Sequence, residues 1–461
     1  MWWVILIFIL ILATLVYLDT RKPYNFPPGP RWWPIIGCLP EFTKLRRKHE
    51  LRLFVWSEIA EKYGPIVGLR IGRGKTVLVS GKDAITEGLS REEFDARQDD
   101  FFARVRTDGE RREQRRFALS HLRDFGFGKK SMEAMIREEA LEMATRLAEK
   151  GKIAGDEVVD AEKMYTIPVL NSLWAMIVGE RYSHDDKILL KLIKVVGDAS
   201  RSLASTDGWV SLYPILRFFF PGFKRYNEVR KRLWKYFSDT VEDHEKTIVD
   251  GQPRDLIDIY IQEMKRRKGE DSSFSKTTSN TLDFATLYLL HHPDVQAKIH
   301  EEIDRVVGRD RTPTLEDKPN LPYLNASIDF VTLPILHCLT VARRKQNSEG
   351  CMLMFNLRSI HMDRDHWGDP EVFRPERFLV PGENGGPMKL KDENWVVPFG
   401  IGRRRCLGEP LARTSLFIFF SIILHRLRFS NPPGLQLPST QGINSTILRT
   451  GPFKAVVQPR F

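Results

Sequence analysis

The chain has 461 residues, of which 42% are hydrophobic and 28% charged. This composition excludes a disordered or collagen-like protein, and four cysteines without a C-x-x-C pair argue against a disulfide framework or a structural zinc site. The formal net charge of +11 allows an anionic membrane surface, a nucleic acid or an acidic protein as partner.

An apolar segment at the N-terminus favours the membrane. Residues 2–18 are apolar except Thr14, and as a helix they would span about 25 Å, close to the ~27 Å core of the endoplasmic reticulum bilayer. A cleaved signal peptide is the competing interpretation, but no basic residue precedes the run and no small-x-small site follows it. Because Arg21 and Lys22 follow the segment, we expect residues 1–22 to be a single anchor in the endoplasmic reticulum membrane, with the rest of the chain in the cytosol.

The next segment, residues 23–40, contains six prolines. Proline cannot continue a helix, so this pattern predicts a stiff, extended linker that holds the globular body at a fixed stance on the bilayer. The globular domain is then expected to occupy residues 41–461.

The globular domain is predicted to be mainly α with small β-sheets. Residues 66–79 alternate and break at glycines, as a β-hairpin does. Residues 208–223 are too aromatic for an ordinary solvent loop, so they either pack inside or touch the membrane beside an apolar substrate entrance. Amphipathic periodicity predicts helices over residues 131–150, 186–206, 224–248, 254–267 and 279–306.

Arginine-rich runs lie at residues 104–116, 265–268 and 403–405. Such runs are usually solvated surfaces, and neither a helix-turn-helix pattern nor zinc-finger spacing accompanies them. We therefore expect no nucleic-acid partner.

The most informative segment is PFGIGRRRCLGEPLAR at residues 398–413, which precedes an apolar run at 416–424. That run is too short for a second membrane span and predicts a buried helix that begins just after Cys406. Helix N-terminal amides and the adjacent Arg404 and Arg405 stabilise negative charge, so the thiol should ionise easily and act as a metal ligand or a nucleophile. The absence of side chains nearby would let a flat, bulky group lie against the backbone. The glycines concerned are Gly400, Gly402 and Gly408.

Six positions here match F-G-x-G-x-R-x-C-x-G, namely Phe399, Gly400, Gly402, Arg404, Cys406 and Gly408. The pattern resembles the haem-thiolate loop of the cytochrome P450 superfamily. The chain also resembles animal microsomal members of the xenobiotic- and steroid-hydroxylating group, insect sequences among them. That resemblance extends over PPGP near residue 28 and over residues 121–133, 277–304, 356–378 and 432–453.

This resemblance implies the P450 fold, with haem b between a long central helix and the helix after the cysteine loop. Cys406 would be the proximal iron ligand, Phe399 would shield its sulfur, and Arg404 and Arg115 would contact the haem propionates. Thiolate donation to the iron favours cleavage of the O–O bond. The implied reaction inserts one atom of O2 into an apolar small molecule. Its electrons come from NADPH through a separate NADPH-cytochrome reductase, because the chain has no nucleotide-binding motif of its own.

The chain departs from the family pattern at three places. Arg111 stands where the family has tryptophan, and Lys276 stands where an acid should precede Thr277, which therefore keeps half of a proton relay. In register, the family's Glu-x-x-Arg would fall on residues 330–333, where neither charge is present. Arg377 would thereby lose both of its usual partners, and leaving a buried charge unpaired costs about 3–5 kcal/mol.

These departures keep a second hypothesis open, that of a catalytically impaired or vestigial haem-binding membrane protein. A third, a cysteine hydrolase that uses Cys406, lacks a histidine in a recognisable context, the nearest being His425.

Overall fold

The structure, a computed structural model, describes most of the chain. The described residues are 2–49, 51–72, 74–94, 130–153, 158–162, 164–178, 181–184, 213–219, 221–249, 276–335, 339–343, 351–382, 386–402, 405–443 and 448–461, with positions 186, 190, 193, 254, 255, 257, 258 and 261. Several predictions therefore fall outside them, including the roles of Arg115 and Arg404, the substitution at Arg111 and most of the helices expected at 186–206 and 254–267.

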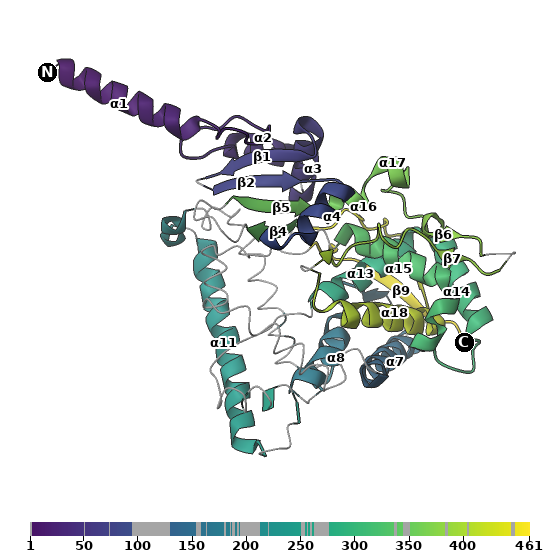
Figure 1. Ribbon diagram of the computed structural model, residues 1–461. Coiled ribbons are helices and arrows are strands. Elements are labelled where there is room, and N and C mark those ends of the chain that lie inside the picture. The colour runs from purple at the N-terminus through teal and green to yellow at the C-terminus, as the bar shows by residue number, and fades with distance from the viewer. Residues whose placement is uncertain are drawn as a thin grey trace.

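The chain begins with one apolar helix, α1 (Trp2–Thr20), which projects away from the rest of the molecule (Figure 1). Its mean hydropathy is 2.4 and none of it is buried. Within the part of the chain that the structure describes, α1 is the one helix long and apolar enough to cross a membrane.

The proline-rich segment is not a uniformly extended linker, because it turns at residues 24–25 and 34–36, and it packs on the body. The Gly68 amide donates to the Pro28 carbonyl at 2.7 Å, and a Cβ on Gly29 would lie 2.2 Å from the Gly68 carbonyl oxygen. Helix α2 (Leu39–Lys48) begins inside the predicted linker, where Pro40 fits the first turn of a helix. These contacts join the end of α1 to the first sheet.

That sheet has the strand order β1-β2-β5-β4. The predicted hairpin is confirmed as β1 (Ile66–Ile71) and β2 (Gly74–Val79), which pair antiparallel. Strand β5 (Met352–Asn356) pairs parallel to β2 and antiparallel to β4 (Leu339–Arg343). Helix α3 (Arg52–Tyr63) packs on β1, and α4 (Lys82–Ser90) follows β2 toward the helical part.

The helical part is organised around α18 (Glu409–Arg426), which lies between α13 and α7 in Figure 1. Every residue from Ser415 to His425 is buried, which explains why this helix is apolar on all sides. The prediction of a buried helix after Cys406 is thus confirmed. The surrounding helices are α7 (Lys130–Ile153), α8 (Thr166–Val178), α13 (Lys276–His291), α14 (Pro293–Val306) and α15 (Pro322–Ile335).

A hydrogen-bonded contact ties three of these helices together. The Tyr165 hydroxyl, just before α8, lies 3.0 Å from Thr286 Oγ1 on α13, and its ring meets Phe419 of α18 edge to face. Thr286 Oγ1 itself donates to the Leu282 carbonyl at 3.2 Å, so Tyr165 is the donor of the pair.

The predicted helices at 131–150 and 224–248 are confirmed as α7 and α11 (Pro221–Thr247). The helix predicted over 279–306 is two helices, α13 and α14, because Pro293 cannot continue the first and occupies the first turn of the second. Within the described part of 208–223, Ile215, Phe218 and Phe219 do not pack inside, since they are 69%, 73% and 76% exposed, whereas Phe223 is buried.

Short elements complete a fold that is mainly α with small sheets, as predicted. Two further sheets are β3-β9-β8 and β6-β7. Their bounds are β3 (Val158–Asp160), β9 (Lys454–Pro459), β8 (Leu427–Ser430), β6 (Leu379–Val380) and β7 (Lys389–Leu390). The remaining helices are α16 (Arg358–His361), α17 (Arg364–Trp367), η1 (Glu92–Phe94), η2 (Pro214–Phe218), η3 (Leu315–Asn320) and η4 (Pro375–Phe378).

Candidate active site

The loop before α18 presents Cys406 on a backbone fixed by hydrogen bonds. The Cys406 amide donates to the Phe399 carbonyl at 2.8 Å, and the Arg405 amide donates to the Gly402 carbonyl at 3.1 Å. Phe399 is buried whereas Cys406 is exposed. The loop therefore holds the cysteine outside the core, at the start of a buried helix.

Two glycines of this loop are required by the conformation and packing of the backbone. Gly400 and Gly402 have φ of +79° and +62°, a conformation that favours glycine. A Cβ on Gly402 would also lie 2.6 Å from the carbonyl oxygen of Leu89 in α4. The absence of a side chain at Gly402 is thus explained by the close approach of α4, and not only by room for a bound group as we expected. Gly408 has an ordinary φ of −82° and caps α18.

A charged cluster supports the first turn of α18. The buried Glu409 accepts hydrogen bonds from Arg405 Nη2 at 2.7 Å and from Arg413 Nε at 2.8 Å. Burial alone would raise the pKa of Glu409, but these two arginines outweigh it and lower the pKa. The Arg413 guanidinium also lies 5.0 Å from the centre of the Phe399 ring. Arg413 therefore links the helix to the backbone segment that holds Cys406.

This arrangement fits a haem iron. An exposed thiol on a fixed loop offers the soft sulfur donor that iron centres accept. His425, the histidine nearest to Cys406 in the sequence, is not placed to assist hydrolysis there, because it is buried near the far end of α18, roughly 24 Å along the helix from Glu409 at 1.5 Å per residue. His425 Nε2 lies 2.8 Å from the Gly308 carbonyl oxygen.

Comparison with protein-family models matches residues 27–457 to Cytochrome P450. This chain belongs to the cytochrome P450 family. Members of the family are monooxygenases that bind haem b through a cysteine thiolate and receive electrons from NADPH through a reductase. The haem iron, when bound, supplies the activation of O2, and the assignment of Cys406 as its ligand stays a prediction from the loop motif.

The P450 is similar to animal members over almost its whole length. It is 31% identical to farnesoate epoxidase of Bombyx mori, over 96% of each chain. It is 30% identical to probable cytochrome P450 303a1 of Drosophila melanogaster, over 99% of each chain, and 32% identical to cytochrome P450 2J2 of Homo sapiens, over 90% of this chain and 88% of the human one. The first alignment is 485 positions long, more than the 461 residues present here, so that relative carries residues without a counterpart in this P450.

Thr277 is the second residue of α13, directly after Lys276. Its side chain lies outside the described part of the structure, as do residues 262–275, so its role in proton transfer stays a prediction. The next residues of the helix, Thr278 and Ser279, are buried. The hydroxyl side chains of Thr278 and Ser279 are therefore buried near the N-terminal end of α13.

The expectation that Arg377 is left unpaired is wrong. Its guanidinium is buried, but Nη2 donates to the carbonyls of Asp369 and Val372 at 2.7 and 2.6 Å and lies 3.2 Å from the Asp369 carboxylate. It also lies 5.7 Å from the centre of the Phe330 ring. Backbone carbonyls of the local turn and the Asp369 carboxylate thus replace the missing charged partners. Phe330 and Leu333, which occupy the Glu-x-x-Arg register, are buried in the hydrophobic core.

Two features of the site were missed by our sequence reasoning. The first is the spacing of Arg405, Glu409 and Arg413, each four residues from the next, which predicts ion pairs on one helix face.

The second is Asp329, the only charged residue in the sequence of α15. Burial raises the pKa of Asp329 to about 6, although Arg413 and Lys318 oppose the shift. Both signals were visible in the sequence.

Proposed function

We propose that this P450 is a monooxygenase anchored in the endoplasmic reticulum membrane, with its catalytic domain in the cytosol. It inserts one atom of O2 into an apolar small molecule by hydroxylation or epoxidation, and NADPH-cytochrome reductase supplies the electrons. The observation that carries the proposal is the exposed Cys406 on a hydrogen-bonded loop at the start of the buried α18. The similarity to farnesoate epoxidase supports an apolar substrate.

Exposed apolar residues near α1 support contact of the catalytic domain with the bilayer surface. Besides α1, the exposed apolar side chains include Ile215, Phe218 and Phe219, in and just after η2. The Tyr213 hydroxyl, next to η2, donates to the Ile35 carbonyl at 3.0 Å. This contact brings the apolar end of η2 close to the segment that follows α1, so both can meet one bilayer surface. An apolar substrate would then enter from the lipid.

Each site residue has a proposed task. Cys406 holds the iron, and Phe399 and the loop glycines Gly400, Gly402 and Gly408 keep the sulfur in place. Arg404 and Arg115 bind the propionates. The Thr277 hydroxyl would hold and relay a proton in the site without the acid that usually assists it.

Reconstitution with reductase, NADPH and isotopically labelled O2 tests the proposal. The full-length P450 should add a single labelled oxygen atom to farnesoate or to a related apolar ester, detected by mass spectrometry. Cys406→Ser should abolish the product, whereas Cys351→Ser, a change at a half-buried cysteine of the sheet region, should leave it unchanged. Labelled product at the wild-type level from Cys406→Ser would overturn the proposal.

A second candidate function is that of a catalytically impaired haem-binding membrane protein. The buried Phe330 and Leu333 in the Glu-x-x-Arg register, together with Lys276 before Thr277, favour it. Such a protein would consume NADPH slowly or release peroxide without oxygenating substrate. The ratio of product formed to NADPH consumed separates the candidates, because a ratio near one eliminates impairment.

A further inference from the structure

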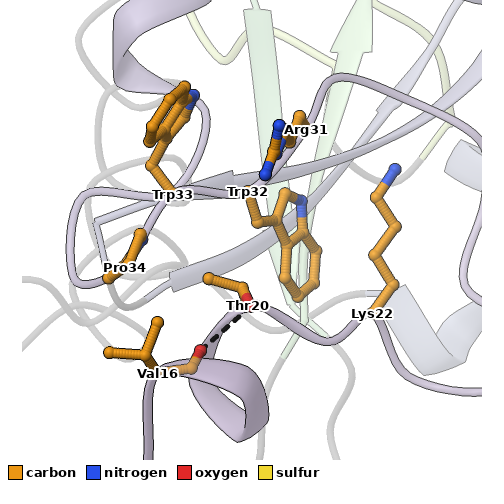
Figure 2. Close-up of a pocket in the computed structure, with 7 residues that line it drawn as sticks. All are labelled: Val16, Thr20, Lys22, Arg31, Trp32, Trp33 and Pro34. Carbon is orange, nitrogen blue, oxygen red and sulfur yellow. Dashed lines mark hydrogen bonds between the residues drawn. The ribbon is translucent and has the colours of Figure 1, made fainter. Parts of the chain in front are cut away.

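We propose that the junction of α1 with the proline-rich segment is a binding site for the headgroup of an anionic phospholipid of the cytosolic leaflet. This proposal rests on the proposed membrane anchor. A cavity of about 390 Å³ lies there, lined by Val16, Thr20 and Lys22 at the end of α1 and just after it, and by Arg31, Trp32, Trp33 and Pro34 of the proline-rich segment (Figure 2).

Two cations line this cavity without an acidic partner. Neither Lys22 nor Arg31 lies within ion-pair distance of a carboxylate among the residues that the structure describes. Lys22 Nζ donates to the Gly29 carbonyl at 2.7 Å, and the Arg31 guanidinium lies 5.2 Å from the centre of the Trp33 ring. The nearby Asp19 is already paired with Arg70 at 2.6 Å and accepts a hydrogen bond from the Ile35 amide. The lining of the cavity therefore carries positive charge from Lys22 and Arg31 that an anion can neutralise.

A buried donor adds a second, independent observation. Trp32 is 4% exposed, and its indole N–H is buried with no acceptor among the described residues. A buried donor without an acceptor is rare in folded proteins, because it loses its hydrogen bond to water without replacement. Figure 2 shows the Trp32 ring beside the side chains of Arg31 and Lys22, with its nitrogen on the side of Arg31. A phosphate oxygen between these cations would provide an acceptor close to the indole edge.

The position of the cavity identifies a lipid as the occupant. Val16 and Thr20 belong to the last turns of α1, whose apolar side chains are exposed toward the bilayer in the proposed orientation. Anionic lipids of the cytosolic leaflet attract basic residues that follow a membrane helix. The headgroup phosphate would bind Lys22 and Arg31, while the acyl chains would follow the apolar face of α1 past Val16. A free phosphate ion would contact Lys22 and Arg31 but not the apolar face of α1.

The test uses the full-length P450 in nanodiscs of neutral phosphatidylcholine, titrated with soluble short-chain phosphatidylserine. We expect saturable binding of one lipid per chain. Each basic residue beside an anionic headgroup is worth about a fivefold change in affinity, so Lys22→Gln with Arg31→Gln should weaken binding roughly 30-fold. Trp32→Phe, which keeps an aromatic side chain of smaller size and removes the donor, should weaken it about tenfold.

A matched control removes two charges outside the cavity. Lys44→Gln with Arg47→Gln changes the net charge equally at exposed positions that do not line the cavity. This pair should bind phosphatidylserine as the wild type does. Equal weakening in both pairs, or the absence of saturable binding, would overturn the site. Equally tight binding of inorganic phosphate or of short-chain phosphatidylcholine would overturn the assignment to an anionic lipid.

A separate experiment tests whether α1 anchors the protein in a membrane. Flotation of the P450 with vesicles of pure phosphatidylcholine reports insertion of α1 without any contribution from headgroup charge. If the protein floats with these vesicles but does not bind phosphatidylserine, the anchor stands and the headgroup site is wrong.

Discussion

The contact between Gly402 and α4 gives the sharpest mutational prediction. Gly402→Ala would place a Cβ 2.6 Å from the Leu89 carbonyl oxygen and would also force alanine into a backbone with φ of +62°. The left-handed conformation costs about 1–2 kcal/mol, and overpacking against a fixed backbone costs about 1–3 kcal/mol. We expect a loss of about 2–5 kcal/mol from a total that is typically about 5–15 kcal/mol.

Gly434→Ala separates the two costs. Gly434 has a φ of +76° and nothing within 4 Å of an added Cβ. This variant should therefore lose only the stability that the left-handed conformation costs an alanine. Denaturant unfolding followed by tryptophan fluorescence gives both losses, and haem content reports the loop that carries Cys406. If Gly402→Ala is no less stable than Gly434→Ala and binds haem equally, the argument that close backbone packing positions the cysteine loop is refuted.

Three further predictions concern polar side chains that are buried or half-buried in the helical part. Asp329 has a folded-state pKa of about 6, above its ordinary 3.8, so its contribution to stability is lost as the pH rises through 6. Asp329→Asn should flatten the pH dependence between about 4 and 6 and stabilise the protein at neutral pH by up to about 3 kcal/mol, measured by urea titration across pH. The pKa of Glu409 is lowered, so wild-type stability should fall on acidification below its ordinary 4.5, and Glu409→Gln should cost about 1.5–3 kcal/mol at pH 7 with a weaker acid dependence. Tyr165→Phe should cost about 0.5–1.5 kcal/mol by losing the bond to Thr286, and the double variant with Thr286→Val should show coupling between the two changes.

Patterns local to the chain predicted much of this fold. The alternation that breaks at glycines identified the β1–β2 hairpin, and the uniformly apolar run after Cys406 identified a helix buried on all sides. The break before Pro293 was also readable, because proline ends a helix, but the continuous periodicity on both sides outweighed it. Periodicity reports which face is apolar, not where the backbone hydrogen bonds stop.

Contacts between distant segments could not be predicted in this way. Gly402 and Leu89 are far apart in the sequence, so the need for glycine is visible only once α4 packs on the cysteine loop. The carbonyl groups that hold Arg377 carry no sequence signature, since every residue has one. The expectation of an unpaired charge considered only residues 330–333 as partners, and so it also missed the Asp369 carboxylate, eight residues before Arg377.

The central claim is that the Cys406 sulfur binds iron. The carbon monoxide difference spectrum of the reduced full-length P450 tests it most directly, with Cys351→Ser as the control at a second described cysteine. We expect the thiolate-type Soret band in the wild type and in Cys351→Ser, and its complete loss in Cys406→Ser. The same band in Cys406→Ser, or its absence from a haem-loaded wild type, would contradict the claim.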